Sequence, residues 1–347
     1  MTGCRVLLDA SAQLFRAGSV NASVREPTPS RRPTVVHIVR ALVAGMVAFV
    51  GLVICDASTA ATFVDDAGRP FRLDHPAQRV ITLAPNLTEL VYAVGAGSTL
   101  VGTVTLSNFP KEAKAVPRVG DHQRFDVERI LLLKPDLVLA WYHGNPGREL
   151  AQLEAAGLPL YYLEPRRLDD VARALERVGD LLGRGAEGRA RANAWRADIA
   201  QLRQAHRGAE PVSVFYQVWR NPLMTLNGEH IVSDVIALCG GRNVFADLPQ
   251  LVPQLSTESV VAANPQVMLS AREDADSGPA LKRAANDPAF AAWSRYPSLD
   301  AVRRNWLYTL PGDLIARQGP RIVDGARGVC AALDEVRTER RSRPRAK

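Results

Sequence analysis

From Val80 onward, short apolar runs alternate with amphipathic stretches. Brief runs rich in β-branched residues, each followed by a helical pattern, are typical of parallel strands joined by crossover helices. The predicted strands are 80–83, 101–104, 137–141, 158–163, 212–217, 267–270 and 306–309. The pattern therefore predicts an α/β protein with parallel, Rossmann-like sheets.

The alternation is interrupted once, by a helical stretch at 167–207. Apolar residues recur there at helical spacing, with a glycine-containing break at 183–188. Such a stretch without a strand predicts a long connecting helix between two lobes, 79–166 and 208–336. We expect the ligand cleft between these lobes, because clefts between domains are common binding places. A helical connector is also expected to allow only small movement of the lobes.

Two segments, 126–139 and 256–269, align without a gap. Each begins with a cap residue, has a glutamate two positions later and a proline seven positions after the glutamate, and ends in a strand pattern. These residues are Asp126, Glu128 and Pro135 in the first segment, and Ser256, Glu258 and Pro265 in the second. The match indicates two related lobes, although the common order of capped helix and strand also produces such a match by convergence.

The formal net charge of +7 lies at the two ends of the chain. Residues 1–60 carry a net +3 and residues 337–347 a net +5, which leaves −1 for 61–336. A nearly neutral body lacks the electrostatic footprint of a nucleic-acid-binding protein, so we expect no nucleic acid as a partner. The segment 337–347 is expected to be a solvated, disordered basic tail.

The N-terminal region has the composition of a targeting segment. A basic cluster at 31–40 precedes an uncharged apolar run at 41–55, and small residues follow at 57–61. This order is that of a secretory signal peptide, so we expect a leader, 1–61, that is cleaved near Ala60, and export to the periplasm. A retained membrane anchor is the alternative, although the run is shorter than the roughly 20 residues that span a bilayer.

Cleavage there leaves a mature chain that begins with a lead-in at 62–78 and contains two cysteines, Cys239 and Cys330. A single pair of cysteines in an oxidising compartment suggests a disulfide. Two buried thiols are the alternative, because a sequence does not show whether the two Cα atoms approach closely enough.

Five segments carry a resemblance to a known family. They are 79–90, 117–120, 128–141, 239–245 and 319–323. They resemble the periplasmic binding proteins of the helical-backbone type, which serve importers of cobalamin, haem and iron–siderophores. The resemblance extends from about Arg79 to Val336. It implies a monomeric solute-binding protein that is no enzyme and delivers its ligand to the permease subunits of an inner-membrane ABC importer.

Within this family the similarity is greatest to the members that bind cobalamin. It is most evident in Trp141, in Asp313 and Arg317, and in the spacing of Cys239 and Cys330. The resemblance implies a disulfide between the two cysteines and a corrinoid ligand. Because a corrinoid brings its own cobalt, no metal or cofactor of the protein itself is expected. Haem or a ferric siderophore is the alternative ligand.

The cobalamin-binding members hold their ligand between aromatic side chains of both lobes, and Trp141 matches one of these side chains. Asp313 and Arg317 match the ends of a loop that touches the ligand. Tyr142 follows Trp141 at the end of a predicted strand, and Trp219 follows another. Ligands of open α/β sheets collect at the carboxyl ends of the strands, which supports a binding role for these aromatic residues. Packing over the core, and a salt bridge within the charged pair, are the alternatives.

Other positions depart from the family pattern. Leu106, which we still expect to contact the ligand, stands where the cobalamin-binding members have tyrosine. His122 and Val252 stand where they have tryptophan, and Val218 where they have phenylalanine. Trp219 is one residue away from Val218 and is a candidate replacement. His122 follows a Gly-Asp turn, which fits either a ligand of the metal in a chelate or a surface-loop histidine.

Glu128 and Glu258 match a further feature of the family, an acidic residue on each lobe that docks against arginines of the permease. A carboxylate at the second position of a helix is favoured by the helix dipole and stays exposed for a partner. First-turn acids without a partner are the alternative interpretation.

The sequence contains no His-Glu-x-x-His, Gly-x-Ser-x-Gly, Walker or Cys-x-x-Cys motif. Its histidines are scattered without the spacing of metal ligands. An exported metal-assisted enzyme is therefore only the third hypothesis, after a corrinoid-binding protein and a binding protein for another metal chelate.

Overall fold

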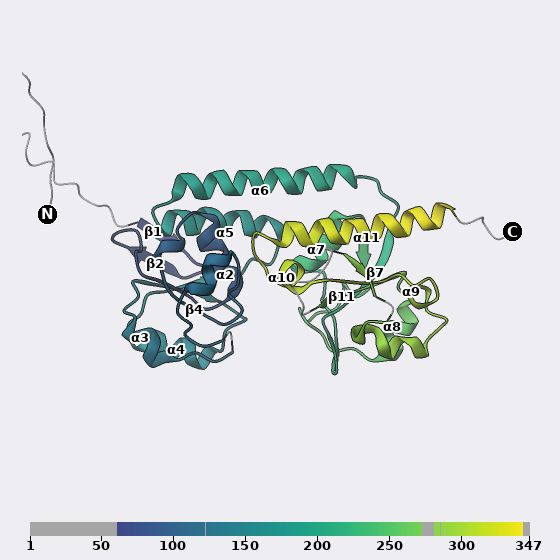
Figure 1. The fold of residues 1–347 in the computed structure, drawn as a ribbon, viewed down its shortest axis with the longest axis horizontal. Coiled ribbons are helices and arrows are strands. Elements are labelled where there is room, and N and C mark those ends of the chain that lie inside the picture. Colours follow the sequence, from purple (N-terminus) through teal and green to yellow (C-terminus); the bar gives the residue numbers. More distant parts are fainter. Residues whose placement is uncertain (1–60, 122, 273–280, 285, 343–347) are drawn as a thin grey trace, which may run out of the picture. The chain divides into compact units, whose positions relative to one another are not determined.

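The computed structural model describes residues 61–121, 123–272, 281–284 and 286–342 (Figure 1). The predicted leader up to residue 60, His122 and residues 343–347 lie outside this part of the chain. Among the described residues, no helix is both long and apolar enough to cross a membrane.

The N-terminal lobe is built around a four-stranded parallel sheet with the order β4-β3-β5-β6. Its elements are β3 (Val80–Thr82), α2 (Pro85–Ala93), β4 (Leu100–Thr103), α3 (Val127–Leu132), β5 (Leu137–Trp141), α4 (Gly147–Ala155) and β6 (Leu160–Leu163). An antiparallel hairpin, β1 (Ala61–Val64) and β2 (Pro70–Leu73), occupies most of the predicted lead-in.

The C-terminal lobe contains a five-stranded sheet with the order β10-β7-β11-β13-β12, in which only β12 is antiparallel to its neighbour. Its strands are β7 (Val212–Gln217), β10 (Gly241–Asn243), β11 (Val267–Arg272), β12 (Lys282–Arg283) and β13 (Leu307–Pro311). Its helices are α7 (Ile231–Leu238), α8 (Thr257–Ala263), α9 (Asp300–Arg303), α10 (Gly312–Ile315) and α11 (Ile322–Ser342). The predicted α/β class with parallel sheets in two lobes is confirmed.

Both sheets are covered on both faces, which explains why their strands read as continuous apolar runs. In β5, Leu137 and Leu139 belong to one buried cluster, whereas Val138 and Ala140 belong to another. The alternation follows from the two-residue period of a strand, which sends successive side chains to opposite faces. The predicted strands agree with the observed ones to within two residues at each end.

The connector consists of two helices, α5 (Leu168–Leu181) and α6 (Gly185–Ala205), rather than one. Figure 1 shows α6 running beside α5 and α11. The two connector helices approach closely at two glycines, since a Cβ on Gly179 would lie 2.9 Å from the Cα atom of Gly188. A larger side chain at this crossing would force the helices apart.

One hydrophobic cluster extends from one lobe to the other through the connector. It contains Leu87 of the N-terminal lobe, Leu175 and Trp195 of the connector, and Ile236 and Leu333 of the C-terminal lobe. The lobes therefore share a core on their connector side. A shared core resists relative movement more than a flexible linker does, because separating the lobes exposes apolar surface.

The two aligned segments have the same local structure. Asp126 accepts a hydrogen bond from the N–H of Arg129 at the start of α3, and Ser256 accepts one from the N–H of Ser259 at the start of α8. Lys134 and Asn264, at equivalent positions just before the proline, both have positive φ angles, 45° and 40°. Few residues other than glycine adopt this region, so the shared conformation supports the prediction that the lobes are related.

The predicted tail is wrong from Arg337 to Ser342, because α11 continues through these residues. Arg337 is buried, and its guanidinium donates to the carbonyl oxygens of Cys239 (2.7 Å), Gly240 (3.0 Å) and Glu210 (2.8 Å). Carbonyl groups at the end of a helix such as α7 have no hydrogen-bond donors within the helix, and the guanidinium of Arg337 provides these donors. The basic composition indicated a solvated segment, but these long-range hydrogen bonds decide its structure.

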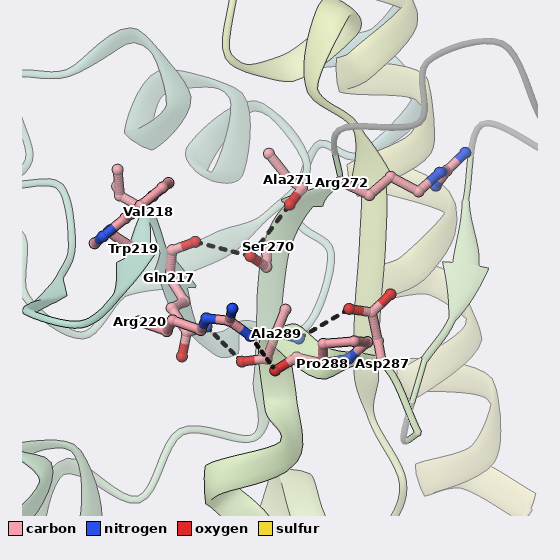
Figure 2. A pocket seen from close by; sticks show the side chains of 10 residues that line it. All are labelled: Gln217, Val218, Trp219, Arg220, Ser270, Ala271, Arg272, Asp287, Pro288 and Ala289. Carbon is pink, nitrogen blue, oxygen red and sulfur yellow. Dashed lines mark hydrogen bonds between the residues drawn. The ribbon is translucent and has the colours of Figure 1, made fainter.

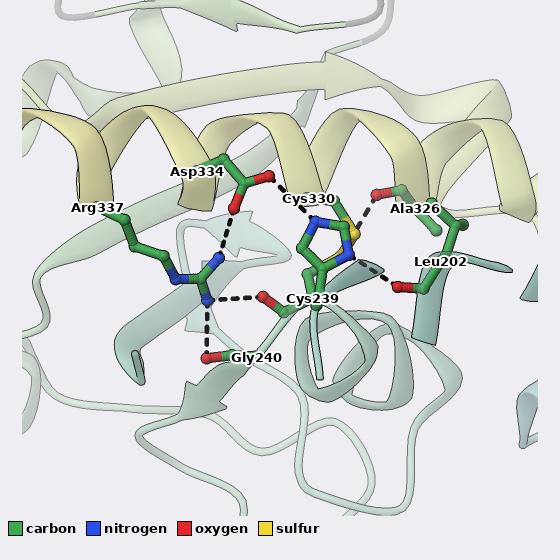
Figure 3. Close-up of a disulfide and its surroundings, with 8 residues drawn as sticks. Leu202, Cys239, Gly240, Ala326, Cys330, Asp334 and Arg337 are labelled. Atoms are coloured by element: carbon green, nitrogen blue, oxygen red, sulfur yellow. Dashed lines mark hydrogen bonds and ion pairs between the residues drawn. A yellow bond between two sulfur atoms is a disulfide. The ribbon is translucent and has the colours of Figure 1, made fainter. Parts of the chain in front are cut away.

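The predicted disulfide between Cys239 and Cys330 is present, with the Cα atoms 4.7 Å apart (Figure 3). It joins the end of α7 to the middle of α11, beside the hydrogen bonds of Arg337. Covalent and polar links at one place therefore fasten the last helix to the C-terminal lobe.

We predict that the double substitution Cys239→Ala/Cys330→Ala lowers the free energy of unfolding by about 2–5 kcal/mol, because the bond closes a long loop in the unfolded chain. Urea unfolding followed by circular dichroism measures the difference. Wild-type protein treated with a reductant serves as the control and should unfold like the variant. Equal midpoints for the oxidised wild type and the variant would contradict a stabilising disulfide.

Candidate ligand-binding site

Trp141 ends β5 and is held by the turn that follows it. Its backbone N–H donates to Oδ1 of Asn145 (2.7 Å), and the amide of Asn145 donates to the carbonyl oxygen of Leu83 (2.9 Å). Gly144 lies against the indole, since a Cβ there would be only 2.0 Å from the Trp141 ring. The half-buried Trp141 ring is therefore fixed at the carboxyl end of the sheet, where the sequence predicted it.

Tyr142 is exposed beside Trp141, and its ring meets those of His143 and Tyr162 edge-on. It lines a cavity of about 410 Å³ together with a charged cluster. In this cluster Nδ1 of His143 contacts the carboxylate of Glu164, and Arg166 lies 3.0 Å from the same nitrogen. No sequence pattern indicated the cluster, because its residues come from separate loops.

A second cavity, of about 460 Å³, lies at the carboxyl ends of β7 and β11 (Figure 2). Trp219, Arg220, Ser270 and Arg272 are among its lining residues. The Trp219 side chain is 55% exposed, and its indole N–H donates to the carbonyl oxygen of Asn221 (2.9 Å). The cavity combines an aromatic face with cationic and hydroxyl groups, which suits a large ligand with both apolar and polar parts.

A short hairpin, β8 (Trp219–Arg220) and β9 (Leu223–Met224), places Trp219 at this cavity. Val218 is half-buried against the shared core, whereas Val252 is exposed. Trp219 is exposed at this strand end and offers the aromatic surface that Val218 lacks. The hairpin was not predicted, because two-residue strands are too short for a periodic signal.

Arg317 is the centre of a polar network between the lobes. Its Nη1 atom donates to Oε1 of Glu89 (3.0 Å) and Oδ1 of Asn108 (2.8 Å). Its Nη2 atom donates to the carbonyl oxygen of Leu106 (2.9 Å) and pairs with Oδ1 of Asp313 (2.5 Å). The amide of Asn108 donates in turn to Oδ2 of Asp313 (3.0 Å). We call these residues, together with Arg321, the inter-lobe clasp.

The clasp explains the position of Leu106. Its backbone has a φ of 65° and its carbonyl is held by Arg317, while its side chain is 63% exposed. A positive φ is unusual for leucine and persists only where the surrounding structure requires it. Leu106, Asp313 and Arg317, which the sequence predicted as separate ligand contacts, are thus assembled into one unit. The salt bridge within the charged pair, the alternative interpretation, is present.

Glu89 was missed as a member of this site. Its place three residues after Asn86 is the spacing typical of a capping box and predicts a helix start at Asn86, but α2 begins at Pro85 with Ala84 as its N-cap. Glu89 is only 3% exposed and pairs with Arg317 and, at 3.3 Å, with Arg321. The clasp partners are separated from Glu89 by 228 and 232 residues, so no local pattern reveals them.

Burial raises the pKa of Glu89 to about 7, against the opposing effects of Arg321 and Arg317. Its Oε2 atom is buried and has no hydrogen-bond partner within the described part of the chain. A buried carboxylate with one unmatched oxygen is costly in its charged form, which is the physical reason for the shift.

Arg321 adds a further contact with the loop after β4, which also carries Leu106 and Asn108. Its guanidinium lies over the ring of Phe109, 4.1 Å from the centroid. In addition, the amide of Asn86 donates to the carbonyl oxygen of Gln318 (3.2 Å). The N-terminal lobe is therefore tied to the segment before α11 by ionic, aromatic and amide contacts.

Glu128 and Glu258 are exposed at the second positions of α3 and α8. The C-terminal end of each helix leads into the start of the next strand. The N-terminal ends therefore lie toward the opposite edges of the sheets, which bear Trp141 and Trp219.

His122 lies outside the described residues. Within those residues, no group of three or more histidine, cysteine or acidic side chains is placed to hold a metal ion.

The structure thus defines a two-lobed α/β protein with exposed aromatic residues at the carboxyl edges of its sheets and a polar clasp between the lobes. A family model described as periplasmic binding protein matches residues 80–314. The chain belongs to this family.

Relatives and solved structures agree with that assignment. The vitamin B12-binding protein of Vibrio cholerae is 36% identical over 258 residues, which cover 74% of this chain and 90% of the relative. The vitamin B12-binding protein of Yersinia pestis is 34% identical over 262 residues, which cover 76% and 88%.

Two solved structures show the fold. A periplasmic vitamin B12-binding protein of Vibrio cholerae has 36% identity and a TM-score of 0.67, and the match covers 75% of this chain and 98% of that one. A periplasmic heme-binding protein from Roseiflexus in its apo form has 27% identity and a TM-score of 0.64, with 75% and 99% covered.

The state of Glu89 predicts a pH dependence of stability. Its pKa is raised from 4.5 to about 7 in the folded protein, so between these values the folded state holds more protons than the unfolded state. The contribution of Glu89 to stability is therefore present at low pH and declines as the pH rises through 7, by up to about 3 kcal/mol. The charged groups that face it are Arg317, Arg321 and Asp313.

Urea unfolding of the wild type and of Glu89→Gln at pH 5, 6, 7 and 8 tests this prediction. The difference between the two free energies of unfolding should change with pH. The matched control Glu187→Gln removes an exposed carboxylate on α6 and should follow the wild type. Parallel pH profiles for the wild type and Glu89→Gln would show that Glu89 is ionised throughout.

Proposed function

We propose that this protein captures cobalamin or a related corrinoid in the periplasm and delivers it to an ABC importer of the inner membrane. The observation that carries the proposal is the 36% identity to a vitamin B12-binding protein over 90% of that relative's length. The exposed Trp219 and the cavity beside it support the proposal, because a large macrocycle needs an apolar face and surrounding polar groups.

In this proposal, Trp141 and Trp219 cover apolar parts of the corrinoid from the two lobes, and Tyr142 borders the site. Arg220 and the carbonyl groups at the strand ends receive its amide side chains. The cavity beside Trp219, about 460 Å³, receives one side of the ligand and not the whole of it. The other side faces the N-terminal lobe.

Asp313 and Arg317 serve the proposed site by holding Leu106. Arg317 already contacts Glu89, Asn108, Asp313 and the carbonyl oxygen of Leu106, so most of its donors are engaged. Leu106 then presents its exposed side chain where the cobalamin-binding members have tyrosine. An aliphatic contact thus replaces an aromatic one at this position.

Haem or a ferric siderophore is the second candidate ligand. Leu106, Val218 and Val252 replace aromatic residues expected for a corrinoid site, and a heme-binding protein shares the fold at 27% identity. His122 is the first residue to examine for metal ligation in that case.

Calorimetric titration of the mature chain, starting at about Thr62, separates these ligands. We expect tight one-to-one binding of cyanocobalamin and weaker binding of haem and of a ferric hydroxamate siderophore. Tighter binding of haem than of cyanocobalamin would overturn the corrinoid assignment and leave the family assignment intact.

We predict that Trp219→Ala weakens cyanocobalamin binding by about 10-fold or more, because it removes an aromatic face worth roughly 1.5–3 kcal/mol when buried. Trp219→Phe keeps an aromatic ring and should lose much less affinity. The same titration measures both variants. If Trp219→Ala binds like the wild type, the ligand does not lie against the β8–β9 hairpin.

Glu128 and Glu258 are proposed to dock the protein on the permease subunits. The double variant Glu128→Ala/Glu258→Ala should keep the ligand affinity of the wild type and associate more weakly with the importer, because rim charges steer association. A pull-down with the importer in detergent or nanodiscs measures this, with Glu187→Ala as the control for loss of an exposed acid. Undiminished association of the double variant would reject this role.

A further inference from the structure

Leu131 and Leu132 on α3 are exposed without a ligand role to explain them. Leu132 is 80% exposed, more than any other large apolar side chain among the described residues, and Leu131 is 38% exposed. Other exposed apolar side chains, such as Leu106 and Trp219, lie at positions assigned to the ligand site. Two adjacent exposed leucines on one short helix form an apolar area that is a candidate contact surface.

The leucines lie beside Glu128. They follow it by three and four positions, so the three side chains share one face of α3. Ile130 lies on the opposite face and is fully buried, which fixes the orientation of the helix. The result is a contiguous surface patch, made of Glu128, Leu131 and Leu132, that combines a carboxylate with apolar area.

The C-terminal lobe has the same patch in a reduced form. The aligned positions on α8 are Glu258, Val261 and Ala262, of which Val261 is half-buried and Ala262 is exposed. The carboxylate is therefore present in both lobes, whereas the large apolar component is present only on α3. The lobes are related in structure but offer unequal docking surfaces.

We propose that the patch on α3 is the apolar anchor by which this protein docks on the periplasmic surface of its importer, and that α8 contributes the charge contact alone. The proposal rests on the function proposed above. The matching partner surface presents a cationic group to Glu128 and an apolar recess to the two leucines.

The leucines and the glutamates contribute to different rate constants. Exposed charges mainly steer association, so their loss lowers the association rate and its salt dependence. Apolar side chains that become buried mainly oppose dissociation. A leucine anchor is therefore recognised by faster dissociation with little change in association.

The experiment compares two matched variants of the mature, ligand-loaded protein. Leu131→Ser/Leu132→Ser alters α3, and Val261→Ser/Ala262→Ser alters the equivalent positions on α8. Each is tested by surface plasmon resonance against the corrinoid importer of the same bacterium, embedded with its ATPase subunits in lipid nanodiscs. Calorimetric titration with cyanocobalamin verifies that each variant retains the ligand affinity of the wild type and hence its fold.

We expect the α3 variant to dissociate at least about 10-fold faster than the wild type, and the α8 variant to dissociate within about threefold of it. Equal dissociation rates for the α3 variant and the wild type would overturn the anchor, and so would equal effects of the two variants. Failure of the wild type itself to associate with the importer would instead remove the proposed function on which the anchor rests.

Discussion

The bond between Arg317 and Glu89 is the interaction on which the arrangement of the site depends. Both side chains are largely removed from water, where a hydrogen bond between them replaces the solvent that each has lost. Asn108 and Asp313 supply the remaining acceptors, and the same arginine holds the carbonyl of Leu106. The relative position of the lobes and the conformation of Leu106, a predicted ligand contact, are therefore determined together.

The surrounding structure supports the clasp from the connector side. A hydrophobic cluster runs through both lobes and the connector, and the indole N–H of Trp195 donates to the carbonyl oxygen of Pro320, next to Arg321. The disulfide and Arg337 fasten α11 within the C-terminal lobe. These contacts favour a nearly fixed frame, in which binding depends on side chains at the sheet edges more than on a large closure of the lobes.

The sequence predicted those parts of the molecule that depend on local periodicity. Strands such as 137–141 were recognisable because both faces of the sheet are buried, and the aligned segments predicted helix caps at Asp126 and Ser256 that are present. The clasp was not predictable in this way, because Glu89 carries a local pattern typical of a helix start and its true partners are more than 200 residues away. Arg337 was misassigned for the same reason. The segment around it has the basic composition of a tail, whereas the hydrogen bonds that bury its side chain are long-range.

Small-angle X-ray scattering of the mature protein with and without saturating cyanocobalamin tests the central claim most directly. If the shared core and the clasp hold the lobes in place while the ligand binds at the sheet edges, the radius of gyration should change little on binding. A large decrease on addition of the ligand would contradict this account. It would mean that the clasp and the core between the lobes open in the free protein.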